Sequence, residues 1–247
     1  MQCFAKSDRG AVRKENQDRA AGARIRRKGC VVGVVCDGMG GAAGGKLASE
    51  LAASTFLAQF RREMMAGSAV EPAMRAACDA ANQAVYGRAC ADPELRGMGT
   101  TIVAACVRHG RLTVLHVGDS RAYIMSGGTL RQISEDHSYV EEMRRLGRIS
   151  EADARSHPQK NLITRAVGVD ATVDGDLFEQ TLADGDILLL CSDGLTGMVE
   201  DGKIAEVLAG AGTLEDKGRE LLTLALEGGG RDNITVALFT CGAKQEA

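Results

Sequence analysis

Four aspartates are the residues of this sequence whose type and placement best suit chemistry. Each lies directly beside an apolar, β-branched run that predicts a strand. They are Asp37 after residues 30–36, Asp119 after 111–117, Asp193 after 186–191, and Asp232 before 234–240. Because antiparallel neighbours bring the end of one strand beside the start of the next, we expect the four carboxylates to share a sheet edge. Such a cluster would be a concentrated acidic site.

Bound cations would relieve the repulsion within this cluster. Two like charges about 4 Å apart repel by about 1 kcal/mol in water and by about 4 kcal/mol at an effective dielectric of about 20. The pattern offers oxygen ligands, which select Mg²⁺ or Mn²⁺ over Zn²⁺. Gly38, Gly118 and Gly194 stand next to three of the aspartates, and we expect them to let the backbone turn sharply. The Gly38 carbonyl could be a further ligand.

A plainer interpretation exists for each of these positions. An Asp-Gly pair after a strand is an ordinary turn signal. We interpret Asp184-Gly185 in this way, as the turn between two strands. The other aspartates differ because four of them occur in equivalent places, which favours a common site.

The elements that position these residues follow from periodicity and turn signals. Strands are predicted at 2–7, 19–25, 30–36, 100–107, 111–117, 121–126, 129–133, 177–182, 186–191 and 234–240. Helices are predicted around Ala48, Ala52, Phe56 and Phe60, and at about 70–90, 138–146, 202–209 and 214–226. This order lacks the steady β-α-β alternation of a parallel sheet. It predicts one domain of antiparallel sheets with helices on their outer faces.

Composition excludes several classes of function. The chain has 247 residues, a net charge of −3, only 3% aromatic residues and no Trp. These values argue against a general nucleic-acid binder and against an aromatic stacking platform. The apolar runs are too short to cross a membrane, and the first residues lack a signal-peptide core. The eight cysteines form no C-x-x-C pair, which is typical of buried thiols in a reducing cytoplasm.

Eight short segments occur in a recognisable order along nearly the whole chain. They are GAVRKENQD (10–18), VCDGMGG (35–41), GTT (99–101), VGDSRAY (117–123), DHS (136–138), NLITRAVG (161–168), SDGL (192–195) and GRDNIT (230–235). The series resembles the PPM family of metal-dependent protein serine/threonine phosphatases, the type 2C phosphatases, in its compact bacterial form. A single Asp-Gly pair is weak evidence, but the ordered series is specific.

This resemblance implies an α+β fold. A central antiparallel β-sandwich would be flanked by helix pairs on both faces, giving four layers in the order α-β-β-α. The whole chain, 1–247, would be a single phosphatase domain, with a flap segment at about 147–170 near the active site. A centre of two tightly bound Mn²⁺ or Mg²⁺ ions would lie in a cleft at one end of the sandwich, with a third, weaker ion beside it.

The resemblance also assigns residues to roles, position by position. Its implied metal ligands are Asp37 bridging both ions, Asp193 and Asp232 as direct ligands, the Gly38 carbonyl, Asp18 acting through water, and Asp119 with Asp193 for the third ion. Arg13 would hold the substrate phosphate, because its planar fork can meet two phosphate oxygens. Thr164 and Arg165 are the flap residues expected to influence substrate choice. His137 is expected to be a hydrogen-bonded structural residue.

The implied activity is hydrolysis of phosphoserine and phosphothreonine by direct attack of a metal-bridging water. The expected partners are phosphorylated proteins, including a Ser/Thr kinase that the enzyme would oppose. We expect a cytoplasmic monomer that binds neither nucleic acid nor membranes. Two alternatives stay open: a pseudophosphatase that only binds, and a phosphatase devoted to one regulator such as a sigma-factor antagonist. A metal-dependent nuclease is disfavoured by the acidic net charge.

Overall fold

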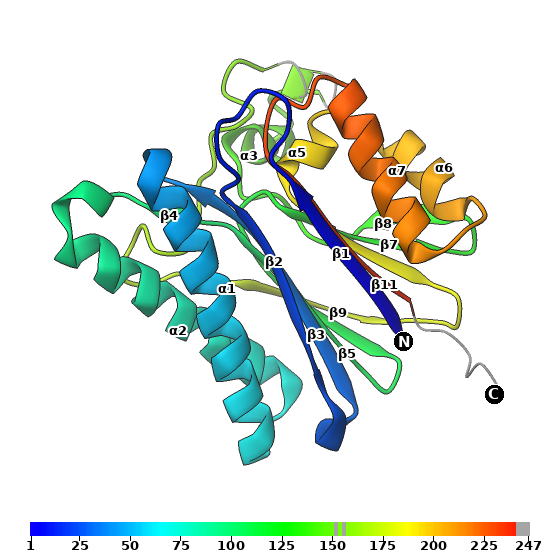
Figure 1. Cartoon of the computed structure of the whole chain (residues 1–247), viewed down its shortest axis with the longest axis horizontal. Helices are drawn as coiled ribbons and strands as arrows, with labels where there is room; N and C mark the ends of the chain where they lie inside the picture. The colour runs from blue at the N-terminus through cyan, green and yellow to red at the C-terminus, as the bar shows by residue number, and fades with distance from the viewer. Residues whose placement is uncertain (151–152, 155–156, 241–247) are drawn as a thin grey trace.

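Two antiparallel β-sheets form the centre of the structure, a computed structural model that describes residues 1–150, 153–154 and 157–240 (Figure 1). The first sheet has the order β1 (Gln2–Asp8), β11 (Ile234–Thr240), β10 (Ile187–Cys191), β7 (Arg121–Ser126) and β8 (Thr129–Gln132). The second has the order β2 (Asp18–Ile25), β3 (Cys30–Met39), β5 (Ile102–Arg108), β6 (Arg111–Val117) and β9 (Asp176–Thr181), and β4 (Gly99–Thr100) pairs with β3. The predicted antiparallel pairing is confirmed.

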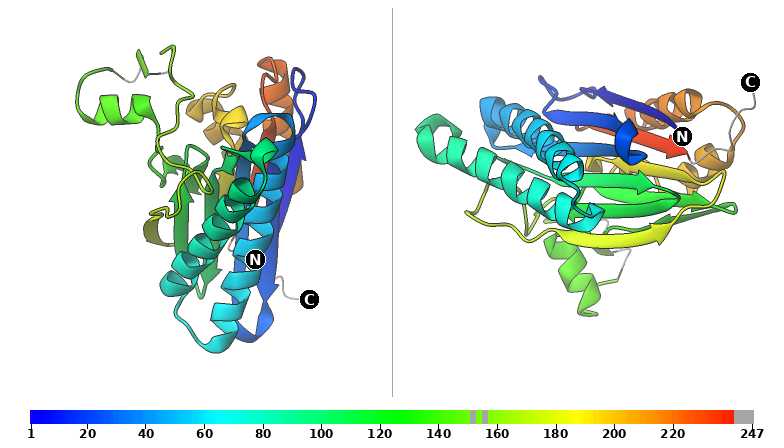
Figure 2. Two further views of the ribbon diagram at one scale, coloured as in Figure 1. Left: turned by 90° about the vertical axis from the view of Figure 1, so that its left-hand side faces the viewer. Right: turned by 90° about the horizontal axis from the view of Figure 1, so that it is seen from below.

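Helix pairs cover the outer face of each sheet (Figure 2). Helices α1 (Gly41–Ala66) and α2 (Val70–Ala91) lie on the second sheet, while α6 (Asp201–Ala209) and α7 (Leu214–Glu227) lie on the first. The four-layer fold is therefore confirmed. The remaining elements are short: α3 (Tyr139–Arg145), α5 (Asp193–Thr196) and the 3-10 turns η1 (Arg26–Lys28) and η2 (Pro93–Leu95). Within the described residues, no helix combines the length and apolar character needed to span a membrane.

Three apolar layers hold the sheets and helices together, and β10 shows how one strand serves two of them. Leu188 and Leu190 pack between the two sheets. Leu189 and Cys191 belong to the layer under α6 and α7. Successive side chains of a strand point to opposite faces, so a strand that is covered on both faces is apolar throughout. The run Ile187–Cys191 is continuous for this reason.

Strand β3 differs from its prediction at the site end. Its expected end was residue 36, with Asp37 beyond it. The strand continues to Met39, because Gly38 and Met39 pair with Thr100 and Gly99 of β4. Asp37 is therefore held inside a strand, where its backbone is fixed by hydrogen bonds.

The glycines beside the aspartates act in two different ways. Gly118 has φ +107°, which fits the predicted sharp turn. For Gly38 and Gly194 the prediction is wrong, because neither has a positive φ. They are needed for close approach: a Cβ on Gly38 would lie 2.0 Å from the Gly45 carbonyl oxygen, and one on Gly194 would lie 2.0 Å from the Asn233 carbonyl oxygen.

Gly194→Ala is expected to lower the free energy of unfolding by about 3 kcal/mol, because the backbone of Asn233 must move to admit the methyl group. Urea denaturation measures the change. Gly202→Ala in α6 is the matched control, since nothing lies within 4 Å of its added Cβ. That control should change stability by less than about 1 kcal/mol and in the favourable direction. Equal losses for both variants would contradict this packing argument.

Candidate active site

A cavity of about 500 Å³ opens at one end of the sandwich, and all four predicted carboxylates line it. Asp37 lies in β3, Asp119 in the β6–β7 connection, Asp193 at the first position of α5, and Asp232 just before β11. These elements belong to both sheets, so the expectation that the carboxylates share the edge of one sheet is wrong. They converge because the strand ends of two stacked sheets meet at the end of the sandwich.

The cavity concentrates buried negative charge. Burial raises the pKa of Asp37 well above its usual range, and the charges of Asp18 and Asp193 add to this. Burial and the charge of Asp193 likewise raise the pKa of Asp119. The pKa of Asp193 is raised by burial first and then by Asp232. A carboxylate cluster of this kind is stable in its charged form only when cations compensate it.

The donor set fits hard divalent cations. Among the described residues, Asp18 Oδ1 and Asp193 Oδ1 are buried and accept no hydrogen bond. No group of three or more Asp, Glu, His or Cys side chains within this part of the chain is already gathered closely enough to hold a metal ion. An all-oxygen donor set suits Mg²⁺ and Mn²⁺, which use few carboxylates and keep several waters. The structure thus agrees with the predicted ion type.

Asp18 lies behind the cavity rather than on its wall. It pairs with Asp37 in the β2–β3 register. Its Oδ2 accepts hydrogen bonds from Ser192 Oγ at 2.7 Å and from Thr235 Oγ1 at 2.6 Å. Burial raises the pKa of Asp18 to about 7, although these two hydrogen bonds oppose the shift. Asp18 also joins the two sheets, since Ser192 and Thr235 belong to the first sheet's side of the sandwich.

The raised pKa of Asp18 predicts how the metal-free protein responds to pH. The unfolded chain has an ordinary Asp pKa of about 4, so between there and about pH 7 the folded state binds more protons. Stability must then fall as the pH rises through this window. Denaturation in EDTA at pH 5, 6, 7 and 8 measures the slope. Asp18→Asn should remove part of it, and an identical slope in that variant would contradict the assignment.

Arg13 is a cation on the cavity wall that contacts one of the carboxylates directly. It belongs to the β1–β2 loop, and its Nη2 donates to Asp232 Oδ2 at 2.6 Å. This hydrogen bond raises the pKa of Arg13. About half of the side chain, 54%, is exposed to solvent, and the residue lines the cavity. Arg13 is therefore placed where an anionic substrate would enter.

Asn233 fixes the loop that carries Arg13, and sequence reasoning gave it no role. Its Oδ1 accepts from the Gln17 backbone N–H at 2.8 Å. Its Nδ2 donates to the carbonyls of Arg9 and Glu15, both at 2.9 Å. The only indication of this role in the sequence was that Asn233 directly follows Asp232. A side-chain amide there can satisfy loop groups that have no strand partner.

Thr101, which also lines the cavity, supports two of the aspartates and was also missed. Its Oγ1 accepts from the Asp37 backbone N–H at 2.9 Å and is hydrogen-bonded to Ser120 Oγ at 2.7 Å. Ser120 directly follows Asp119. The Thr101 side chain therefore links the backbone of Asp37 to the side chain of the residue that follows Asp119. Its place in the Gly-Thr-Thr segment was the only sequence signal.

The structure places the two predicted flap residues away from the cavity wall. Asn161 and Ile163 line the cavity from this segment instead. The Thr164 backbone N–H donates to the His137 carbonyl at 2.8 Å. Arg165 Nη1 donates to Asp176 Oδ1 at 2.8 Å. Both residues anchor the base of the flap, whose positions 151, 152, 155 and 156 lie outside the described residues.

His137 is a structural residue, as predicted. Its Nδ1 accepts from the Gly118 backbone N–H at 3.0 Å, while its Nε2 lies 3.0 Å from Asp176 Oδ2 and 3.1 Å from Arg165 Nη1. The imidazole thereby holds the turn that presents Asp119. Its partners leave no ring nitrogen free for a metal ion.

Comparisons with known proteins agree with this geometry. A profile of the family described as protein phosphatase 2C matches residues 10–224. The serine/threonine phosphatase stp of Listeria monocytogenes is 38% identical over 240 residues, which cover 96% of this chain and 95% of that protein. The crystal structure of Staphylococcus aureus Stp1 has a TM-score of 0.89 at 34% identity, covering 98% of this chain and 95% of that one. The catalytic domain of the phosphatase PstP, solved with two manganese ions, has a TM-score of 0.86 at 36% identity and covers 98% of both chains.

The family match extends over most of the chain and includes nearly every segment that contributes to the cavity. The activity is therefore metal-dependent dephosphorylation of phosphorylated proteins at serine and threonine, with Mn²⁺ or Mg²⁺ as the cofactor. On this basis the chain belongs to the protein phosphatase 2C family of metal-dependent serine/threonine phosphatases.

Proposed function

We propose that the aspartate-lined cavity is the catalytic centre, with Asp37 bridging two cations that Asp193, Asp232 and the Gly38 carbonyl also hold. The observation that carries the proposal is that these residues line one cavity together with Arg13. Asp18, which lies behind Asp37, would act through water. When bound, the cations would activate a water molecule and neutralise charge on the phosphate.

Arg13 would bind and orient the phosphate. Its guanidinium can donate two parallel hydrogen bonds to phosphate oxygens. To bind the phosphate, Arg13 would give up its hydrogen bond to Asp232. That carboxylate would then be free to bind a cation. Substrate binding and cation binding thus favour the same arrangement of the two side chains.

Asp119 would hold a third, weaker cation together with Asp193. Both carboxylates line the cavity, and the charge of Asp193 raises the pKa of Asp119. Asp119→Ala is expected to lower kcat by at least about tenfold while changing KM much less. Steady-state kinetics at saturating Mn²⁺ test this. An unchanged kcat would remove Asp119 from the proposed machinery.

In the cell, we propose that the chain is a cytoplasmic, monomeric, single-domain phosphatase that reverses the action of Ser/Thr kinases. The intact set Asp18, Asp37, Asp193 and Asp232 supports turnover over the pseudophosphatase alternative. The relatives named serine/threonine phosphatase in Listeria and Staphylococcus support this class of substrate.

The substrate class is tested with an autophosphorylated Ser/Thr kinase domain and an autophosphorylated tyrosine kinase domain as the control. With Mn²⁺ present, mass spectrometry should show loss of phosphate from Ser and Thr and retention on Tyr. Hydrolysis of p-nitrophenyl phosphate without any loss from the Ser/Thr kinase would contradict kinase opposition. Loss from neither substrate would favour the pseudophosphatase.

A further inference from the structure

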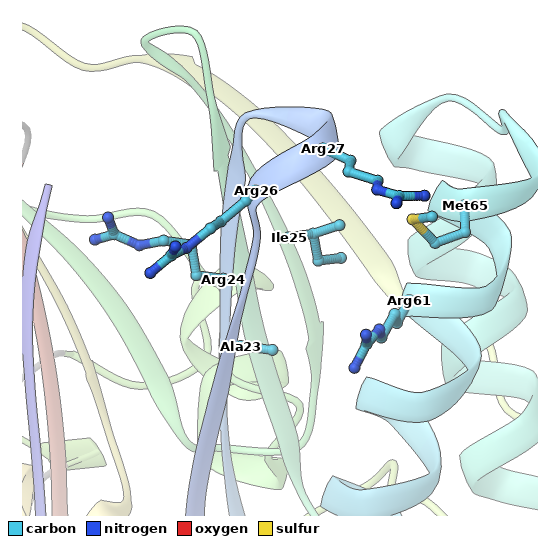
Figure 3. A pocket seen from close by; sticks show the side chains of 7 residues that line it. All are labelled: Ala23, Arg24, Ile25, Arg26, Arg27, Arg61 and Met65. Carbon is cyan, nitrogen blue, oxygen red and sulfur yellow. The ribbon is translucent and has the colours of Figure 1, made fainter.

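A second hollow, of about 450 Å³, lies between the β2–β3 turn and α1 (Figure 3). Its floor is apolar: Ile25 is buried beneath it, and Ala23 and Met65 contribute to its wall. Met65 is 43% exposed, which is unusual for a large apolar side chain in this molecule. The hollow therefore offers an apolar surface that no other part of the described chain covers.

Two arginines border this apolar floor. Figure 3 shows Arg27 extending from the turn toward Met65, and Arg61 extending from α1 toward the hairpin. Arg24 and Arg26 point to the other side of the hairpin, where Arg24 Nη2 donates to the Met1 carbonyl at 2.8 Å. Arg24 and Arg26 also line the hollow, but the side chains that extend into it in Figure 3 are those of Arg27 and Arg61.

Neither Arg27 nor Arg61 has an ion pair or a side-chain hydrogen bond with any residue that the structure describes. Other helical arginines do: Arg75 pairs with Glu71, and Arg219 with Glu215, each at four-residue spacing. The positions four residues before and after Arg61 are Leu57 and Met65, which cannot pair with it. Both guanidinium groups therefore border the hollow without a counter-charge.

The surrounding chain adds mostly positive charge. Residues 24–30 read RIRRKGC and contain no carboxylate. The one acidic side chain in the last turns of α1, Glu63, is hydrogen-bonded to Gln59 and Ser68. The chain as a whole carries −3, so this end is a local positive patch on an acidic molecule. Such a patch attracts anionic partners selectively.

The patch lies far from the aspartate cavity. Strand β2 begins at Asp18, beside the cavity, and ends at Ile25, in the floor of the hollow. Seven steps of a strand span about 23 Å, and Figure 1 shows the β2–β3 turn at the opposite end of the sandwich from α5. A group bound in the hollow therefore cannot reach the carboxylates. An extended segment would need about seven or more residues to connect the two places.

We propose that this hollow docks an acidic segment of a protein substrate, distant in sequence from the phosphorylated residue. Carboxylates would meet Arg27 and Arg61, whose planar forks bind them bidentately. An aliphatic side chain between the carboxylates would lie on Ile25 and Met65. Docking raises the effective concentration of the phosphorylated residue at the cavity. This role rests on the proposed function, in which the cavity hydrolyses phosphoproteins.

The test uses phosphothreonine peptides with a Glu-Glu-Leu-Glu-Glu segment placed about ten residues away across a Gly/Ser linker, on either side. The control peptides carry Gln in place of each Glu. For the wild-type protein, at least one of the two acidic peptides should have a KM about fivefold lower than that of its Gln control. The kcat should be unchanged. The double variant Arg27→Glu/Arg61→Glu should lose this difference. Arg62→Glu, on the same helix and outside the hollow, should keep it.

Two further readouts separate a loss of docking from a loss of folding or of catalysis. Turnover of p-nitrophenyl phosphate should be equal in all variants, which shows that each is folded. Binding of the acidic segment without phosphothreonine, measured by fluorescence polarisation, does not depend on turnover. Such binding without hydrolysis of any phosphopeptide would support docking while removing the proposed function.

Three results would overturn the docking proposal. One is an equal KM for acidic and neutral peptides in the wild-type protein. A second is an equal loss of the difference in Arg62→Glu and in the double variant. The third is equal binding of a single-stranded oligonucleotide of the same charge, which would make the hollow a general polyanion site.

Discussion

Asp193→Asn is expected to lower kcat for a phosphothreonine peptide by at least about a thousand-fold and to make the metal-free protein more stable. Asp193 is a buried member of the carboxylate cluster, and its Oδ1 accepts no hydrogen bond from the described residues. Burial and the neighbouring Asp232 raise its pKa, so its charge is unfavourable unless a cation compensates it. Asparagine keeps the shape and removes that charge.

The two effects have opposite signs, which makes the result informative. Steady-state kinetics with Mn²⁺ measure the loss of activity, and urea denaturation in EDTA measures the gain in stability. Asp184→Asn is the matched control, because Asp184 also precedes a glycine but lies in the exposed β9–β10 turn. That variant should change neither quantity. A less stable metal-free Asp193→Asn protein would contradict the electrostatic account of the cavity.

Arg13→Ala is expected to lower kcat/KM by about a hundred-fold, because the phosphate loses a charged donor that is positioned at the cavity wall. Arg13→Lys keeps the charge without the planar fork and should recover only part of the loss. Arg9→Ala, in the same loop, is the control. Stopped assays of phosphate release from a phosphothreonine peptide measure all three variants.

The Arg13 variants should remain folded. The ion pair with Asp232 is well exposed, with 54% and 31% of the two side chains accessible. Exposed pairs contribute about 0–1 kcal/mol, so the loop depends mainly on Asn233 for its position. A kcat/KM within about twofold of wild type in Arg13→Ala would remove Arg13 from phosphate binding.

Sequence patterns predicted the interior of most elements better than the ends that form the site. Strands β6, β7 and β11 have the predicted bounds, because clear turn signals or glycine runs flank their apolar stretches. Strand β3 continues beyond its predicted end because β4, about 60 residues later, pairs with Gly38 and Met39. A long-range partner of this kind leaves no trace in local periodicity.

In the candidate site too, features set by local sequence pattern could be predicted, while features set by distant partners could not. Asp37, Asp119, Asp193 and Asp232 were expected to converge because of their equivalent places beside strands, and they do line one cavity, although from the ends of two sheets rather than from one sheet edge. The supporting roles of Asn233 and Thr101 could not be predicted, because their partners are distant in the chain. The physical cause is that hydrogen bonds between loops depend on tertiary placement rather than on spacing.

Flap residues illustrate a different limit. The segment around Thr164 and Arg165 lies next to the cavity, as the resemblance implied. Which of its side chains face the cavity depends on the path of an irregular loop, and there the wall is formed by Asn161 and Ile163. Arg165 is instead paired with Asp176. Without a regular period, sequence cannot assign the direction of a loop side chain.

The central claim is that the carboxylates at the end of the sandwich hold the cations that make this chain a phosphatase. The most direct test is phosphate release from a phosphothreonine peptide by EDTA-treated protein, before and after addition of Mn²⁺, with Asp193→Asn in parallel. We expect no release without metal, full recovery with Mn²⁺ in the wild-type protein and no recovery in the variant. Release that is equal with and without metal, or equal in both proteins, would contradict it.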